Sequence, residues 1–248
     1  MSFFTEKSKC GASMIVDNTL QQELINNAGV NYFCGGAISN AAMTNRRGKV
    51  CELTYEDLWK IRRILLDNHV HKIYTKHIGC WNLCCPPEFR NTLMTMKDTF
   101  DRQAFIPVQK YGTAENTVEG EIGHIIDFRI VEVPDMFRWE DAGDFISEVV
   151  PVSDTEGHGR CVPAQEDGVD NTYINNGSRY TVFPLLIIGK DSFVKANFRN
   201  GKNCYRFHQG LAVDDPYVNH LTSSILRQNG TLIIHPERLM RIHTLARQ

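Results

Sequence analysis

The sequence predicts a soluble globular protein that contains both helices and strands. Hydrophobic residues make up 42% and charged residues 23% of its 248 positions, which is the balance of a folded domain. Two segments show helical periodicity behind a capping residue, and several short β-prone runs are bounded by glycine, asparagine or proline. A chain of this length buries roughly three quarters of its unfolded surface, so one large or two medium domains are expected.

The charge balance argues against a nucleic-acid-binding surface. The chain has 27 basic and 29 acidic residues, which gives a formal net charge of -2. Its one short basic cluster, residues 45–49, is interpreted as a solvated loop, with a nucleic-acid or partner contact as the alternative.

The amino terminus lacks a signal-peptide core, and the longest apolar run, residues 183–188, is too short to cross a bilayer. We therefore expect a cytoplasm-like compartment, no membrane partner, and eight mostly reduced cysteines.

The first predicted helix covers residues 17–28. Asp17 or Asn18 can cap it, and Gly29 ends it. Apolar residues recur at four-residue spacing on one face, while the other face is rich in amides. The stretch VNYFCGGAIS that follows predicts a short strand, which loosens at the two adjacent glycines.

The clearest helix in the sequence covers residues 54–66. Thr54 and Asp57 stand where a capping pair belongs, and apolar residues recur at helical spacing behind them. Residues 71–84 predict a strand, after which two prolines open a third helix through PEFRNTLMTM. The pattern indicates a strand-to-helix unit.

The second half of the chain predicts mainly strands. Residues 180–188 form a mostly apolar strand in which Pro184 cannot donate a ladder hydrogen bond, which favours an edge or a bulge there. Asn200 and Gly201 indicate a hairpin turn. Residues 231–234 predict a last strand before the short closing segment.

Residues 119–134, EGEIGHIIDFRIVEVP, admit two interpretations. Two carboxylates and one imidazole within six positions could form a metal or acid/base site, since residues three apart share a helical face. These residues are Glu119, Glu121 and His124. Gly120 and Gly123 oppose a helix, and the run after them is rich in β-formers. The pattern therefore favours a turn that delivers the chain into a strand near Phe128.

A second candidate metal site combines three thiols with one imidazole. It consists of His77, Cys80, Cys84 and Cys85. The spacing is not one of the usual zinc patterns, and the alternative is a set of small buried residues at a strand-to-helix junction. The sequence contains no nucleophile elbow and no phosphate-binding loop, so it offers no positive sign of an enzyme.

Several segments, taken in order, carry a resemblance to a known family. They are NNAGVNYFCGGAIS, LTYEDLWKIRRIL, GEIGHIIDFRIVEV, YTVFPLLIIGKDSF, AVDDP and LIIHPERLMRI. In order and spacing they resemble the major capsid proteins of tailed double-stranded DNA phages, in the branch typified by the short-tailed coliphage N-four. The most specific element is GEIGHIIDFRIVEV, followed after a variable insert by a strand that ends at Gly189.

The resemblance implies an α+β architecture, the Hong Kong phage major capsid fold. This fold has a peripheral domain, built on a spine helix and long strands, and an axial domain whose sheet is flanked by helices. The expected spine helix is residues 17–28, and residues 140–179 form a long insert. The peripheral domain takes residues 1–50 and 197–235, and the axial domain takes residues 51–196 and the closing segment 236–248.

The function that the resemblance implies is structural and not enzymatic. Copies of the chain in pentamers and hexamers would close an icosahedral shell around double-stranded DNA, in a virion assembled in the host cytoplasm. No cofactor, metal or catalytic residue is implied. The residues expected to serve turns or subunit contacts are Gly120, Gly123, Phe128, Gly189, Asp215 and Pro216.

Other virion proteins are expected partners, among them the portal and a cement protein. A further polypeptide could supply the amino-terminal arm that the family carries, because only sixteen residues precede the expected spine helix. Two alternatives stay open. The chain could be a minor or cement capsid protein of the same virion, or a zinc-binding or metal-dependent soluble protein that uses the cysteine cluster.

Overall fold

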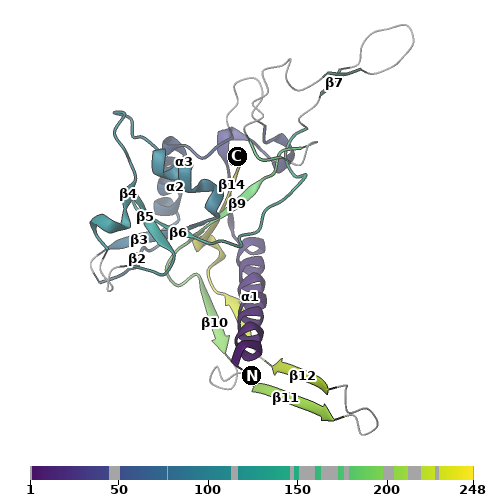
Figure 1. Cartoon of the computed structure of the whole chain (residues 1–248). Coiled ribbons are helices and arrows are strands. Elements are labelled where there is room, and N and C mark those ends of the chain that lie inside the picture. The colour runs from purple at the N-terminus through teal and green to yellow at the C-terminus, as the bar shows by residue number, and fades with distance from the viewer. Residues whose placement is uncertain are drawn as a thin grey trace. The chain divides into compact units, whose positions relative to one another are not determined.

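The largest sheet of the structure is mixed and has eight strands (Figure 1). Its strand order is β1-β14-β9-β3-β6-β5-β4, and β2 pairs with the beginning of β3. The pairs β1/β14 and β3/β6 are parallel, and the other neighbours are antiparallel. The strand bounds are β1 Val30–Phe33, β2 Ile73–Tyr74, β3 Gly79–Cys85, β4 Ile106–Pro107, β5 Glu121–Ile125, β6 Phe128–Glu132, β9 Phe183–Ile188 and β14 Leu239–Thr244.

The chain divides into two units, and each is described by itself. The smaller one, the α1 unit, comprises Met1–Asn26 and Phe193–Ile234, and the larger one, the sheet unit, comprises Asn27–Ser192 and His235–Gln248. Both combine helix and strand, which confirms the α+β class. The structure is a computed structural model that describes residues 2–44, 51–76, 78–112, 117–145, 148–150, 160–162, 173–175, 179–197, 204–211, 219–226 and 229–247.

Helix α2, Tyr55–Asp67, begins where the sequence predicts. The Asp57 amide donates to Thr54 Oγ1 and the Thr54 amide donates to Asp57 Oδ2, each over 3.2 Å, which forms a complete capping box. Tyr32 of β1 also donates its hydroxyl to Asp57 Oδ1 over 2.6 Å. The start of α2 is therefore fixed both by its own cap and by the sheet.

Helix α3, Arg90–Thr95, follows the 3-10 turn Pro87–Phe89, as the two prolines predict. Both α2 and α3 contribute to one core with the sheet, and Figure 1 shows them close together against it. Alternate residues of β3 enter this core, and so do three residues of α2 at helical spacing. They are Trp81, Leu83 and Cys85 of β3, and Leu58, Ile61 and Leu65 of α2.

The α1 unit combines one long helix with two antiparallel strand pairs. Its elements are α1 Ser2–Asn26, the pair β10 Phe193–Asn197 with β13 Asn229–Ile233, and the pair β11 Cys204–Leu211 with β12 Asn219–Leu226.

Within the expected insert, β7 Glu148–Val150 pairs with β8 Arg160–Val162. The other 3-10 turns among the described residues are Cys34–Gly36, Asn40–Ala42, Val108–Lys110 and Pro236–Arg238.

The expected bounds of the first helix were wrong at both ends. Helix α1 starts at Ser2, well before residue 17, and it ends at Asn26, two positions before residue 28. The first part of this helix has no apolar period and contains Gly11, so neither amphipathicity nor propensity marks it as helical. The sequence FFTEKSK contains no residue that forbids a helix, however, and the helix extends through it.

The two units divide the chain at other positions than the expected peripheral and axial domains, whose assignment stays a prediction. Residues that follow Asn26 join the sheet unit, because β1 pairs in parallel with β14. The unit that was expected to end at residue 196 ends at Ser192, because β10 begins at the next residue and pairs with β13. The boundaries between the two units lie after Asn26, Ser192 and Ile234.

Two strand predictions need similar correction. The segment 71–84 is not one strand, because β2 turns back at Thr75, whose amide donates to Ile78 O over 3.0 Å, and pairs with β3. The turn expected at Asn200 and Gly201 lies outside the described residues; the strands on either side of it, β10 and β11, pair with β13 and β12 and not with each other. An asparagine-glycine pair indicates a turn but does not specify which strands pair.

Strand β9 combines an interior place in the sheet with a proline. It lies between β14 and β3, but the ladder to β3 covers only Leu186, Ile187 and Ile188. Pro184 lies beyond that ladder, opposite His243 of β14. The strand is therefore paired on only one side where the proline stands, which agrees with the local edge predicted there.

Candidate functional site

The EGEIGH stretch does not form a helix: Glu119 and Gly120 lie in a turn, and Glu121 begins β5, the first strand of a β-hairpin. Strands β5 and β6 are joined by Ile126 and Asp127, with Ile125 opposite Phe128. Ile126 has φ 55°, a left-handed conformation that a β-branched residue rarely adopts. The predicted strand at Phe128 is present, but the turn that enters it lies after His124 and not at the glycines.

The two glycines of this stretch have different roles. Gly120 has φ 79° and lies in the turn before β5, where a glycine is favoured. Gly123 lies within β5, where a Cβ atom would lie 2.5 Å from Ile106 O and still closer to the Phe105 ring. The glycine at position 123 is therefore required by the close approach of the β4 segment and not by a turn.

The two glutamates and the histidine do not form a metal or acid/base site. Glu121 instead makes an ion pair with Arg129, with Oε2 3.3 Å from Nε and both side chains 1% exposed. Tyr111 donates its hydroxyl to Glu121 Oε1 over 2.6 Å, and the Val118 amide donates to Oε2 over 2.9 Å. Glu119 lies on the surface. The Glu121 carboxylate is therefore occupied by structural contacts.

His124 lies beside this ion pair. Its ring packs edge-on against Tyr111 at a centroid distance of 4.7 Å. Burial, together with the charge of Arg129, lowers the pKa of His124 against the opposing effect of Glu121. In the part of the chain that the structure describes, His124 Nδ1, Asn82 Oδ1 and Arg129 Nη1 are buried without a hydrogen-bond partner. These residues stand opposite one another on three adjacent strands.

The cysteine cluster does not converge either. Cys84 and Cys85 are consecutive in β3, so their side chains point to opposite faces of the sheet. Cys80 and Cys84 are four residues apart, about 13 Å along a strand, whereas two thiolates on one zinc ion lie within about 4.6 Å. Burial raises the pKa of the Cys84 thiol to about 12. His77 lies outside the described residues, which contain no group suited to hold a metal.

Asp127, in the hairpin turn, fastens the hairpin to α2. Its Oδ2 accepts from Arg62 Nε over 2.6 Å, and its Oδ1 lies 2.8 Å from Lys72 Nζ. Burial opposes ionisation of this carboxyl, but the hydrogen bonds and charges of Lys72 and Arg62 hold its pKa below the usual value. The strained turn is thus stabilised by two cations from outside the hairpin.

The other candidate contact residues lie inside the fold. Phe128 is fully buried, with its ring 5.7 Å from that of Trp81. Gly189 directly follows β9, and a Cβ atom there would lie 3.0 Å from Arg238 O and closer to Val70. Asp215 and Pro216 lie outside the described residues. The described candidates therefore serve packing within one chain, and their part in subunit contacts stays a prediction.

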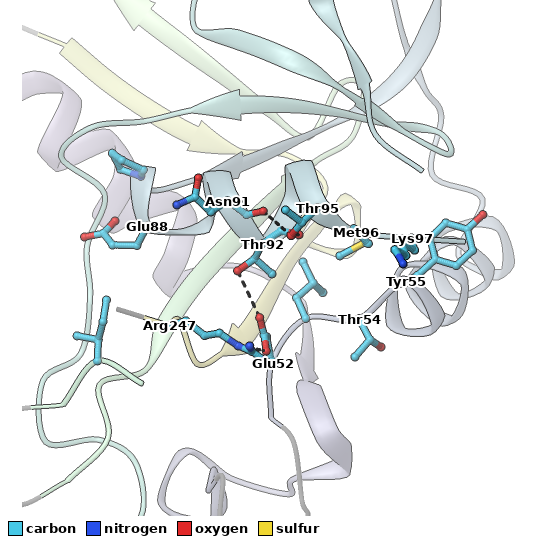
Figure 2. A pocket seen from close by; sticks show the side chains of 13 residues that line it. Glu52, Thr54, Tyr55, Glu88, Asn91, Thr92, Thr95, Met96, Lys97 and Arg247 are labelled. Carbon is cyan, nitrogen blue, oxygen red and sulfur yellow. Dashed lines mark hydrogen bonds and ion pairs between the residues drawn. The ribbon is translucent and has the colours of Figure 1, made fainter. Parts of the chain in front are cut away.

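A groove that the sequence did not indicate runs along α3 (Figure 2). Its volume is about 620 Å³. Figure 2 shows Asn91, Thr92 and Thr95 of α3 along one wall, with Glu52 and Arg247 facing them. The capping pair and the two prolines mark the start of the flanking helices, but no sequence motif indicated a cavity between them. We call this feature the α3 groove.

Glu52 is the most highly connected side chain of the α3 groove. Its carboxylate accepts from Thr92 Oγ1 over 3.3 Å, from the Tyr173 hydroxyl over 2.9 Å and from Arg247 Nε over 3.0 Å. Burial and the hydrogen bond to Glu52 raise the pKa of Tyr173 to about 12. This network fastens the carboxy-terminal residues to the segment before α2.

Glu88, at the other end of the groove, is less well paired. Its Oε1 lies 3.8 Å from Arg138 Nη1, near the limit of an ion pair. Its Oε2 is buried and has no hydrogen-bond partner among the described residues. The Glu88 side chain as a whole is 30% exposed, so part of its carboxylate reaches the surface of the groove.

Comparison with known proteins gives two relationships. The chain is 32% identical, over 96% of its length, to the major capsid protein of Pseudomonas phage KPP21. It spans 58% of that relative, so the match covers little more than half of the longer protein. No family model matches the sequence. Among the described helices, none is long and apolar enough to span a membrane.

The structural comparison supports the same relationship. The capsid of Ralstonia phage GP4 superposes with a TM-score of 0.55 at 12% identity, covering 90% of this chain and 53% of that one. At such low identity the match shows the fold alone, and it agrees with the Hong Kong phage capsid fold that the resemblance implied. Over the matched region, the chain is thus similar to the major capsid protein of a phage and has a phage capsid fold.

Proposed function

We propose that this chain is a structural subunit of a phage shell, and that its copies assemble into the pentamers and hexamers of an icosahedral capsid around double-stranded DNA. The observation that carries the proposal is the 32% identity to a phage major capsid protein along 96% of the chain. A shell needs heterologous contacts repeated around its symmetry axes, so the active parts of such a protein are surfaces and not a catalytic centre.

The chemistry of the sheet unit supports a structural role. Its candidate acid and base groups take part in contacts that hold the fold together, as Glu121 does with Arg129 and Asp127 with Arg62. The net charge of -2 also suits a shell that contains packed DNA without holding its phosphates. The virion is the proposed location, and the portal and a cement or arm-supplying protein are proposed partners.

Expression of the chain, alone and together with the other capsid genes of its phage, tests this function. Size-exclusion chromatography and negative-stain microscopy should then show rings or closed shells that contain the chain. A strictly monomeric chain under both conditions, together with its absence from purified virions, would refute the proposal. A low copy number at one vertex would favour the minor or cement protein.

A further inference from the structure

Residues 97–103, which follow α3, form a closed loop with a fixed backbone. Asp98 Oδ1 accepts the amides of Phe100 and Arg102, each over 2.8 Å, and the Asp98 amide donates to Arg102 O over 2.8 Å. A bridge between Lys97 and Gln103 closes the base of the loop. A network of this kind holds the tip of the loop in one conformation. We call these residues the Phe100 loop.

The Phe100 loop presents an aromatic ring to the solvent. Phe100 is 78% exposed, among the most exposed large apolar residues of the described chain. The guanidinium of Arg102 lies 5.7 Å from the centroid of the ring. Phenylalanine and arginine are both enriched at protein–protein interfaces relative to the rest of a protein surface. A protein partner that covered the ring would remove its apolar surface from water.

The α3 groove has the complementary properties. Leu53, Met96 and Ile174 contribute apolar surface to it. Glu88 adds a negative charge, and its side chain is 30% exposed. Figure 2 shows Glu88 at one end of the groove and Lys97 at the other. A ligand with an apolar ring and a neighbouring cation would therefore meet both an apolar lining and an acceptor.

We propose that the Phe100 loop of one copy binds in the α3 groove of a neighbouring copy, with Arg102 donating to Glu88. This inference rests on the proposed shell function, and it names one contact that joins the copies. A heterologous interface needs two different complementary surfaces on every subunit, and the sheet unit carries both. The Phe100 loop does not fill the groove of its own chain, because the Phe100 side chain is 78% exposed in the single chain.

A charge exchange tests the contact in phage particles. Variants Arg102→Glu and Glu88→Arg, supplied from a plasmid to a phage that lacks its own copy, should each lower the particle yield about tenfold, equivalent to ~1.4 kcal/mol. The double variant should recover most of the yield, because the charges are then exchanged across the contact. A double variant no better than the worse single variant would overturn the inference.

The contribution of the Phe100 ring to the contact is tested with a separate variant and a matched control. Phe100→Ala should lower particle yield while leaving the urea midpoint of the unassembled chain unchanged, since the ring makes little contact within its own chain. Ile38→Ala is the control, because Ile38 is 88% exposed and lies outside both the loop and the groove. Normal yield from Phe100→Ala would contradict the contact.

Cross-linking identifies the partner directly. The pair Phe100→Cys and Thr95→Cys should give disulfide-linked multimers of this chain in particles, because Thr95 lines the groove. Cys85 gives little background reaction, since burial raises the pKa of its thiol. A link to a different virion protein would overturn the proposal of a second copy. If the wild-type chain itself is missing from particles, both this contact and the proposed function fail. If the wild-type chain is present and the variants assemble as well as it does, only the contact fails.

Discussion

Gly123 shows that a residue can be essential for packing where the sequence indicated a turn. A Cβ atom at this position would meet the Phe105 ring and the Ile106 carbonyl. We expect Gly123→Ala to destabilise the sheet unit by about 1–3 kcal/mol, and Gly123→Val by more. The urea midpoint can be followed by tryptophan fluorescence, because all three tryptophans lie in the sheet unit.

Phe105→Ala supplies the control for this prediction. In the Phe105→Ala background the cost of Gly123→Ala should fall, since the ring is removed, but it should not vanish, since the Ile106 carbonyl remains. An equal cost in both backgrounds would show that Phe105 does not limit the space at Gly123. His124→Ala should cost less than Gly123→Ala, because it loses only the contact with the Tyr111 ring.

Asp127 gives the hairpin a predictable dependence on pH. Its folded-state pKa is lowered, so its contribution to stability is fully present above the unfolded pKa of about 3.9 and is lost as pH falls through the folded value. Asp127→Asn should destabilise the sheet unit by about 1.5–3 kcal/mol near pH 7. Urea midpoints measured from pH 7 to about pH 2 should show this difference shrinking below about pH 4. A difference that is constant over the whole range would contradict the assignment.

The buried pair of Glu121 and Arg129 should behave as a unit. Glu121→Gln keeps only one of the two oxygens that accept from Tyr111 and Val118, and it leaves the Arg129 cation buried without a counter-charge, so we expect a loss of about 3–5 kcal/mol. The double variant with Arg129→Met should cost less than the sum of the two single variants. A double-mutant cycle from urea unfolding measures this coupling, and additivity within about 0.5 kcal/mol would contradict it.

At the scale of elements, local signals determined which predictions were correct. Helix α2 could be predicted because Thr54 and Asp57 form a capping box that is encoded within four residues. Thr54→Ala should therefore cost about 1 kcal/mol of stability in urea unfolding. A cost below about 0.3 kcal/mol, with the hydrogen bond between Tyr32 and Asp57 intact, would show that the sheet alone fixes the start of the helix.

Elements with weak local signals were predicted wrongly. Helix α1 extends to Ser2 without amphipathicity, and the hairpin turn at Ile126 adopts φ 55° against the preference of a β-branched residue. That turn depends on Asp127 and its cations, which come from residues far away in sequence. Pairing between distant strands, such as β1 with β14, likewise has no signature in either strand alone.

For the candidate site residues, too, the predictions failed where contacts between distant parts of the chain decide the structure. Two acidic residues beside a histidine suggested chemistry, but the partner that occupies Glu121 is Arg129, which is contributed by the neighbouring strand. The α3 groove combines residues from four separate parts of the chain, so no short motif could indicate it. By contrast, the ordered set of segments that resembled phage capsid proteins agrees with the 32% identity to a phage major capsid protein, because order and spacing are properties of the whole sequence.

At the scale of the whole molecule, the proposed function depends on surfaces that a single chain leaves uncovered. The Phe100 loop and the α3 groove are two such surfaces on the sheet unit. Variants inside the fold, such as Gly123→Val, should lower assembly by unfolding the chain, whereas variants of the loop should lower assembly without any loss of stability. Comparing the urea midpoint with the particle yield for each variant separates these two causes.

The copy number of this chain in purified virions tests the central claim most directly. Quantitative mass spectrometry of particles gives that number relative to every other virion protein. If the chain builds the shell, it should be the most abundant protein of the particle by copy number. Its absence, or its presence in a few copies beside another protein that forms the shell, would contradict the account.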